Sequence, residues 1–304
     1  MSKRSFVSTM RLLCAGFTVF LSGCSMEVLS PKGDIGMQER TLILTALGLM
    51  LIVVVPVIVM TLAFAWRYRS TNTKATYAPK WAHSTAIEVV VWTVPCIIVS
   101  ILAVIAWRTS HTLDPYRPLD SNVKPITVEA VSLDWKWLFI YPDYGVASVN
   151  ELAMPVNVPV NFKITSDTVM NSFFIPQLGS QIYAMAGMET KLHLIANEAG
   201  NYEGLSANYS GEGFSDMHFQ AIATTQQGFD DWIKKAKAGS GDLTMATYEM
   251  LAKPSMRLPV TYYSNVSPDL FGGIVHKYMV APAAAGSAPM AQMTMPNTEV
   301  KAAE

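Results

Sequence analysis

The sequence predicts a membrane hairpin of two α-helices, followed by an all-β sandwich with a C-terminal helical arm. Two long apolar stretches, Thr41 to Trp66 and Ser84 to Trp107, contain a single carboxylate and no Lys or Arg. The chain after them reads as short strands separated by turns, and its apolar period becomes helical beyond Thr225. Only 15% of the residues are charged, against roughly 25% in a typical soluble domain, so a purely soluble protein is excluded.

The net charge and the positions of the cysteines exclude some binding partners and some kinds of site. The 304 residues have a formal net charge of −1, and basic residues do not cluster outside the membrane flanks. A nucleic-acid partner is therefore not expected. The three cysteines, Cys14, Cys24 and Cys96, all precede the soluble region, which can hold neither a disulfide nor a thiolate-bound metal.

Residues 1–23 have the pattern of a signal peptide. A positively charged start precedes the apolar run Leu12 to Leu21, which is too short to span a bilayer. The run ends in Leu21-Ser22-Gly23-Cys24, which resembles a bacterial lipobox and predicts a lipid such as palmitate on Cys24. The alternative is a chance cysteine near an ordinary cleavage site.

Residues 24–111 form the predicted N-terminal segment and hairpin, with spans at 41–66 and 84–107. Pro56 and Pro95 are expected to kink the spans, which a membrane helix tolerates. The loop between the spans carries four basic residues and no acid, so the positive-inside rule places it in the cytoplasm and both termini in the periplasm. Aromatic residues expected at the membrane interfaces are Trp66, Tyr68, Trp81 and Trp107.

Residues 112–225 form the predicted sandwich. Apolar residues alternate strictly from Val156 to Ile164, which predicts one strand with a buried face, and Pro159 on its other face favours an edge or a bulge. Several short strands at this spacing are typical of a sandwich or barrel. The other strand candidates are Ile126 to Val131, Lys136 to Tyr141, Lys191 to Ala196 and His218 to Ala223.

Residues 226–280 form the predicted arm, which we expect to pack against the sandwich or a partner subunit. Ser267-Pro268-Asp269 resembles an N-cap, a first-turn proline and an early acid before a helix at Leu270 to Met279. The tail 281–304 is rich in Ala, Met and Pro and is expected to be disordered. Two helical patterns precede that helix: Phe229, Trp232, Ile233 and Ala236 on one stripe, then Tyr248, Met250 and Leu251.

Several motifs resemble subunit II of the haem–copper oxidases. The match runs from about Gln38 to Met279 and includes Asp134-Trp-Lys-Trp137, similar to the strand that opens the family's cupredoxin domain. Glu88-Val-Val-Val-Trp92-Thr-Val-Pro95 resembles the pattern of the family's second helix, apart from the last spacing. The resemblance implies a cupredoxin-like sandwich in the periplasm.

The family's copper-binding members use two cysteines, two histidines, a glutamate and a methionine in a dinuclear copper centre that accepts electrons from cytochrome c. Serine hydroxyls lack the softness and acidity of thiolates, so the resemblance implies that the copper site is lost here. In this sequence the cysteine positions hold Ser206 and Ser210, the histidine positions Asn171 and Phe214, and the glutamate position Asn208, while Met217 is retained.

This loss of ligands resembles the quinol oxidases of the superfamily, nearest to the cytochrome bo-type ubiquinol oxidases. The resemblance implies an accessory subunit of a proton-pumping oxidase with ubiquinol as its substrate. No cofactor is then expected in this chain, because haems and a copper ion would lie in subunit I. Partners would be subunit I, the other oxidase subunits and membrane lipids, without cytochrome c. Menaquinol oxidase subunit II, cytochrome c oxidase subunit II and a lone cupredoxin lipoprotein are alternatives.

Glu88 is the candidate catalytic residue. It lies about four residues inside the second span, where an unpaired carboxylate costs a few kcal/mol and is a functional candidate by default. In the family, the glutamate at this place opens a proton-uptake channel, and the resemblance implies that role here. The alternative is a snorkelling carboxylate paired with Lys80 or with a cation of a partner subunit.

The remaining His and Trp residues carry weaker signals. His193 alternates with leucines on a strand and is expected to be a surface or satisfied core residue, while His111 and His276 at segment ends are expected to be solvated. A mononuclear copper site at His218 is disfavoured, since no cysteine is nearby. Trp135 and Trp137 are expected on one side of a strand, with a role in packing or subunit contact rather than electron relay.

Overall fold

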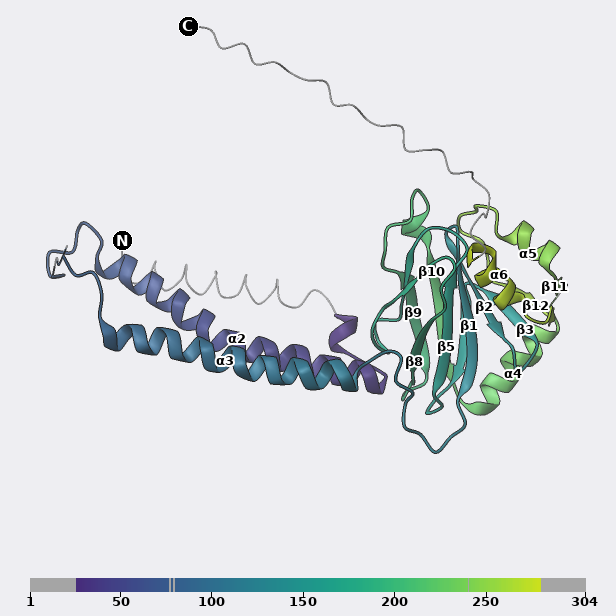
Figure 1. Ribbon diagram of the computed structural model, residues 1–304, viewed down its shortest axis with the longest axis horizontal. Helices are drawn as coiled ribbons and strands as arrows, with labels where there is room; N and C mark the ends of the chain where they lie inside the picture. The colour runs from purple at the N-terminus through teal and green to yellow at the C-terminus, as the bar shows by residue number, and fades with distance from the viewer. Residues whose placement is uncertain (1–25, 77, 79, 240, 280–304) are drawn as a thin grey trace, which may run out of the picture.

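A computed structural model describes residues 26–76, 78, 80–239 and 241–279. The signal peptide, Cys24 and the tail 281–304 lie outside the described residues. Figure 1 shows an elongated two-helix hairpin with a β-sandwich at one end, whose strands run across the long axis of the hairpin. The short 3-10 helix Glu27–Leu29 (η1) precedes the hairpin. The fold class predicted from the sequence is confirmed.

The hairpin consists of α2 (Asp34–Arg67) and α3 (Thr85–Thr112), both long and apolar enough to span a membrane. Pro56 and Pro95 lie inside these helices. Nearly all the apolar side chains on both helices are exposed, which is the expected state of surfaces that face lipid or other membrane subunits. Both helices continue past the apolar stretches at their sandwich ends, so α2 begins at Asp34 rather than at Thr41.

Two sheets pack face to face in the sandwich. One has six strands in the order β12-β3-β2-β1-β5-β8, and the other has five in the order β4-β10-β9-β6-β7. Their bounds are β1 (Ile126–Leu133), β2 (Lys136–Tyr141), β3 (Val146–Val149), β4 (Glu151–Pro155), β5 (Val160–Ser166), β6 (Asn171–Phe174), β7 (Ile182–Ala184), β8 (Thr190–Leu194), β9 (Gly200–Ser206), β10 (His218–Thr224) and β12 (Thr261–Tyr263). A separate pair joins β11 (Asp242–Leu243) to β13 (Asn265–Val266).

The strand predicted from Val156 is shorter than its alternation indicated. β5 begins only at Val160, because Asn157 has a φ of +59° and turns the chain after β4. Pro159 therefore precedes the strand, and its carbonyl accepts a hydrogen bond from the Ile126 amide at 3.0 Å. The expectation of an edge or bulge at Pro159 is wrong, since β5 lies between β1 and β8.

The first helix of the arm packs into the core between the two sheets, and the other two helices cover the outer face of the six-stranded sheet. The arm consists of α4 (Gln226–Lys237), α5 (Met245–Leu251) and α6 (Leu270–Met279), which lie on the side of the sandwich away from the hairpin (Figure 1). Four residues of α6 are buried in a second core that includes Val131 and Leu138 of the sheet. The predicted cap is wrong in detail, because Asp269 has a φ of +57° and α6 starts only after it.

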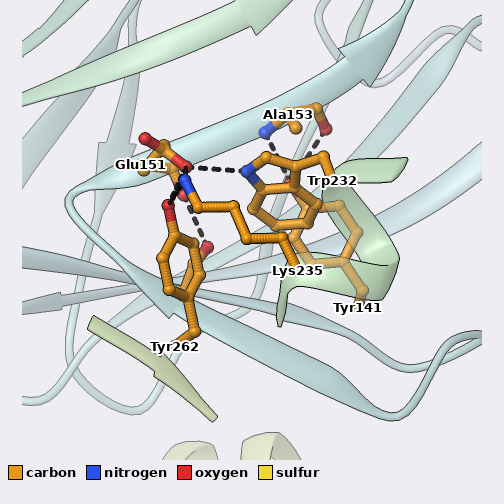
Figure 2. Close-up of polar contacts among 7 residues, drawn as sticks. Tyr141, Glu151, Ala153, Trp232, Lys235 and Tyr262 are labelled. Carbon is orange, nitrogen blue, oxygen red and sulfur yellow. Dashed lines mark hydrogen bonds and ion pairs between the residues drawn. The ribbon is translucent and has the colours of Figure 1, made fainter. Parts of the chain in front are cut away.

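A partly buried carboxylate connects α4 to the sandwich. Glu151 at the start of β4 accepts hydrogen bonds from Trp232 Nε1 at 2.7 Å and from the Tyr262 hydroxyl at 2.5 Å. Figure 2 shows Lys235 beside this carboxylate, with its Nζ 2.7 Å from the Tyr262 hydroxyl. Behind them Tyr141 both donates to and accepts from the backbone of Ala153, each at 2.8 Å, so these contacts tie α4, β12, β2 and β4 together.

The burial of two tyrosine hydroxyls, those of Tyr141 and Tyr248, predicts that the protein loses stability at alkaline pH. Burial raises the pKa of Tyr141, and burial together with the hydrogen bond to Asp167 raises that of Tyr248. The free energy of unfolding should therefore hold its full value below about pH 10, where unfolded tyrosines begin to ionise, and fall above it.

Unfolding followed from about pH 8 to 12 should show this decline, with phenolate absorbance of the two residues rising only as the chain unfolds. Tyr248→Phe should make the decline shallower, because one phenol no longer ionises on unfolding. An identical slope in the variant would contradict the assignment.

Candidate functional site

The residues at the expected copper-ligand positions meet at one end of the five-stranded sheet. Asn171 begins β6, Ser206 ends β9, and Met217 directly precedes β10. These three strands are neighbours in the order β10-β9-β6. Phe214 lies in a one-turn 3-10 helix (η2, Phe214–Asp216) within the loop that joins β9 to β10. The structure thus brings together residues that are far apart in the sequence.

At this end of the five-stranded sheet, the side chains of Asn171, Ser206 and Asn208 form hydrogen bonds with other groups of the protein. Ser206 Oγ donates to Asn171 Oδ1 at 2.7 Å, and both residues are less than 5% exposed. The amide nitrogens of Asn171 and Asn208 donate to backbone carbonyls of the segment 169–170 at 3.2 and 2.9 Å. Buried polar groups need such partners, so these bonds make a closed, hydrogen-bonded end of the sheet.

The donor set does not fit a thiolate-bridged copper pair. Ser210 Oγ lies 4.0 Å from Met217 Sδ, and the Phe214 ring packs edge-on against Tyr209 with centroids 5.6 Å apart. Hydroxyls, amides and one thioether remain, without the thiolates and imidazoles that suit copper. Within the described ranges there is also no group of three or more His, Cys, Asp or Glu residues able to hold a metal ion.

The two tryptophans expected on one side of a strand lie in different environments. Trp135 is in the turn between β1 and β2, with a φ of +62°, and its indole nitrogen donates to the Ser210 carbonyl at 3.2 Å. Trp137 is fully buried in β2, with ring centroids 5.3 Å from Phe173 and 5.9 Å from Phe219. The expectation of a shared face is wrong, because the hairpin turns before Lys136.

The histidines form local contacts. His193 is half-buried on β8 with Nδ1 2.7 Å from Asn161 Oδ1, and burial lowers its pKa. His218 is exposed, with Nδ1 2.9 Å from Glu203 and Nε2 2.9 Å from a backbone carbonyl. His111 Nδ1 lies 2.7 Å from the Trp107 carbonyl, and His276 is exposed on α6.

Glu88 lies in the first turn of α3, about 4.5 Å along the axis from Thr85 at 1.5 Å per residue. Its side chain is 52% exposed, and Oε1 is 3.8 Å from His83 Nδ1. Within the described part of the chain the basic side chain beside the carboxylate is thus His83, not the Lys80 considered from the sequence. A carboxylate in a first helical turn is favoured by the helix dipole, and here it stands at the basic end of the hairpin.

Sequence reasoning missed the junction that fixes the hairpin to the sandwich. Gly36 N donates to the Leu178 carbonyl at 3.0 Å, and Lys32 N donates to the Gln177 carbonyl at 2.7 Å. A Cβ on Gly33 would lie 2.5 Å from the Ile195 carbonyl oxygen, so only glycine permits this approach. The glycines of this polar segment were the available signal, but their partners lie more than 140 residues away.

Two family models match the chain. "Cytochrome C oxidase subunit II, periplasmic domain" covers residues 146–223, and "COX Aromatic Rich Motif" covers residues 237–281. These matches fall on the sandwich and the arm and define an oxidase subunit II. Among solved structures, the periplasmic domain of subunit II of cytochrome oxidase from Bradyrhizobium japonicum is 23% identical with a TM-score of 0.37, covering 40% of this chain and 97% of that one.

Relatives that are similar over most of the chain show to which group of oxidase subunits it belongs. Cytochrome bo(3) ubiquinol oxidase subunit 2 of Pseudomonas aeruginosa is 62% identical over 91% of this chain and 84% of its own. Ubiquinol oxidase subunit 2 of Acetobacter aceti is 53% identical over 86% and 85%, and quinol oxidase subunit 2 of Bacillus spizizenii is 39% identical over 81% and 77%. The chain belongs to the quinol oxidase subunit 2 family of the haem–copper oxidases.

Proposed function

We propose that this chain is subunit II of a proton-pumping terminal ubiquinol oxidase and that it carries no redox centre itself. The observation that carries the proposal is the buried hydrogen bond between Ser206 and Asn171, at the place where copper-binding relatives need a thiolate and an imidazole. Electrons would pass from ubiquinol to haem in subunit I, which would also hold the catalytic copper. The identity to ubiquinol oxidase subunits supports ubiquinol over menaquinol.

The proposed location is the bacterial inner membrane. The basic loop between α2 and α3 would face the cytoplasm, with the sandwich and the N-terminus in the periplasm. A lipid on Cys24 would then anchor the N-terminus at the same surface as the sandwich. Intact-mass measurement of the purified chain and of Cys24→Ser should differ by the lipid and by signal-peptide processing, and equal masses apart from the substitution would reject lipidation.

The chain would serve the complex in two ways. The exposed apolar faces of α2 and α3 need other membrane subunits or lipid as neighbours, which supports a role in stabilising subunit I. Glu88, at the end of α3 that joins the basic loop, would collect protons on the cytoplasmic side and pass them toward subunit I. Its place in the first turn of α3, beside the basic loop, would put the carboxylate close to cytoplasmic water, as proton uptake requires.

Purification from the native membrane in mild detergent tests the proposal. We expect this chain to co-purify with a large hydrophobic haem-bearing subunit and to support oxygen uptake with a ubiquinol analogue. Faster turnover with a menaquinol analogue would reassign the quinol. A near-infrared copper band with cytochrome c oxidation would overturn the proposal in favour of a cytochrome c oxidase, and absence of both haem and partner would leave a lone lipoprotein.

A further inference from the structure

A cavity of about 860 Å³ lies where the hairpin meets the sandwich. Its walls come from the start of α2, the end of α3, the linker 113–120 and the edge strand β8. The volume falls within the range of about 300–1,000 Å³ that is typical of ligand sites. Neither the copper-ligand positions nor Glu88 contributes to it.

The lining changes from apolar to charged along the cavity. Thr41, Leu42 and Ile105 line one part and belong to the apolar stretches that would lie within the bilayer. Arg117 and Asp120 line another part and follow the last apolar residue of α3, at the level of lipid headgroups. The cavity is therefore continuous with the membrane surface and has the same polarity gradient as a lipid molecule.

The charged part suits a zwitterionic headgroup. Arg117 is a donor for a phosphate, and the carboxylates of Asp34, Asp114 and Asp120 are acceptors for an ammonium group. Arg117 is half-exposed and meets Asp120 only through a single 3.4 Å contact, so it can bind a phosphate at little cost. An excess of carboxylates disfavours a headgroup with net negative charge.

We propose that this cavity binds one membrane phospholipid with a zwitterionic amine headgroup, phosphatidylethanolamine being the simplest, with an acyl chain along the α2–α3 groove. The phosphate contact to Arg117 favours a free phospholipid over a lipid attached to cysteine, which carries no phosphate. The bound lipid would fill the junction between membrane hairpin and sandwich. This inference does not depend on which quinol the complex uses.

The test is native mass spectrometry of the intact complex that contains this chain, in detergent micelles doped with phosphatidylethanolamine or phosphatidylglycerol. We expect one retained phosphatidylethanolamine, lost on denaturation, and preferred over phosphatidylglycerol. Arg117→Ala should reduce its retention about tenfold, the effect of losing a charge-assisted hydrogen bond. Thr109→Trp, which fills the cavity from α3, should abolish retention.

Arg108→Ala is the matched control, since Arg108 is an exposed arginine on α3, next to Thr109, and does not line the cavity. It should leave lipid retention unchanged. Equal retention in the wild type, Arg117→Ala and Thr109→Trp would overturn the proposal, as would a quinone mass lost in the same two variants. A lipid mass that persists after denaturation would instead identify a covalent anchor and also overturn it. Haem content, measured in parallel, tests the proposed oxidase function separately.

Discussion

Asp167→Ala is expected to loosen the helical arm by about 3 kcal/mol while the sandwich stays folded. The Asp167 side chain is 1% exposed and lies just after β5. Its carboxylate accepts from the Tyr248 hydroxyl of α5 at 2.7 Å and from Lys277 Nζ of α6 at 2.8 and 3.1 Å. One buried acid thus joins α5 and α6 to the sandwich, and its hydrogen bond raises the pKa of Lys277.

Removal of the Asp167 carboxylate would leave the buried Tyr248 hydroxyl without its hydrogen-bond acceptor, and this unpaired group accounts for much of the expected loss of stability. Hydrogen-exchange mass spectrometry of the purified complex should show faster exchange in α5 and α6 and unchanged exchange in β1 and β5. Asp231→Ala is the matched control, because Asp231 forms an exposed 2.8 Å ion pair with Lys234 on α4 and should have no measurable effect. Uniformly faster exchange through the sandwich would contradict a local role for Asp167.

The hydrophobic pattern over a few consecutive residues was enough to predict β2 and α4 from the sequence. The range Lys136 to Tyr141 is the observed β2, and all four stripe residues of α4 are buried. All six residues of β2 are buried, because the second sheet covers one face and the arm covers the other. That explains why β2 lacks alternation in the sequence although it lies in a sandwich.

The features that the sequence did not predict depend on contacts between residues far apart in the chain. β6 and β9, which position Asn171 and Ser206, were not recognised as strands. β6 has only four residues, β9 contains two glycines and an asparagine that have low strand propensity, and both strands gain stability from partners distant in sequence. Val156 has strand-like alternation but lies in a turn after β4. Asp167 carried no pattern at all, since its partners are 81 and 110 residues away. The convergence of the copper-ligand positions was expected only from the family resemblance, not from spacing.

Glu88→Gln is expected to slow quinol-driven oxygen uptake about tenfold while haem content and subunit composition stay unchanged. Glutamine keeps the volume and the hydrogen-bonding capacity of the side chain but cannot take up a proton. Glu88→Asp, which retains a carboxyl group on a shorter chain, should recover part of the rate. Turnover per haem and proton uptake per electron, measured on complexes with equal subunit content, check the prediction.

The pairing of Glu88 with His83 supplies the competing explanation. If the carboxylate only balances charge at the start of α3, Glu88→Gln should lower assembly or stability and leave turnover per haem unchanged, and His83→Gln should do the same. The matched control is Glu39→Gln on α2, at the sandwich end of the hairpin, where glutamine can still accept the hydrogen bond from Ser180. This variant should turn over at the wild-type rate, because Glu39 lies at the opposite end of the hairpin from the basic loop. A slow Glu39→Gln variant would show that loss of any hairpin carboxylate impairs the complex, and Glu88 would lose its assigned role.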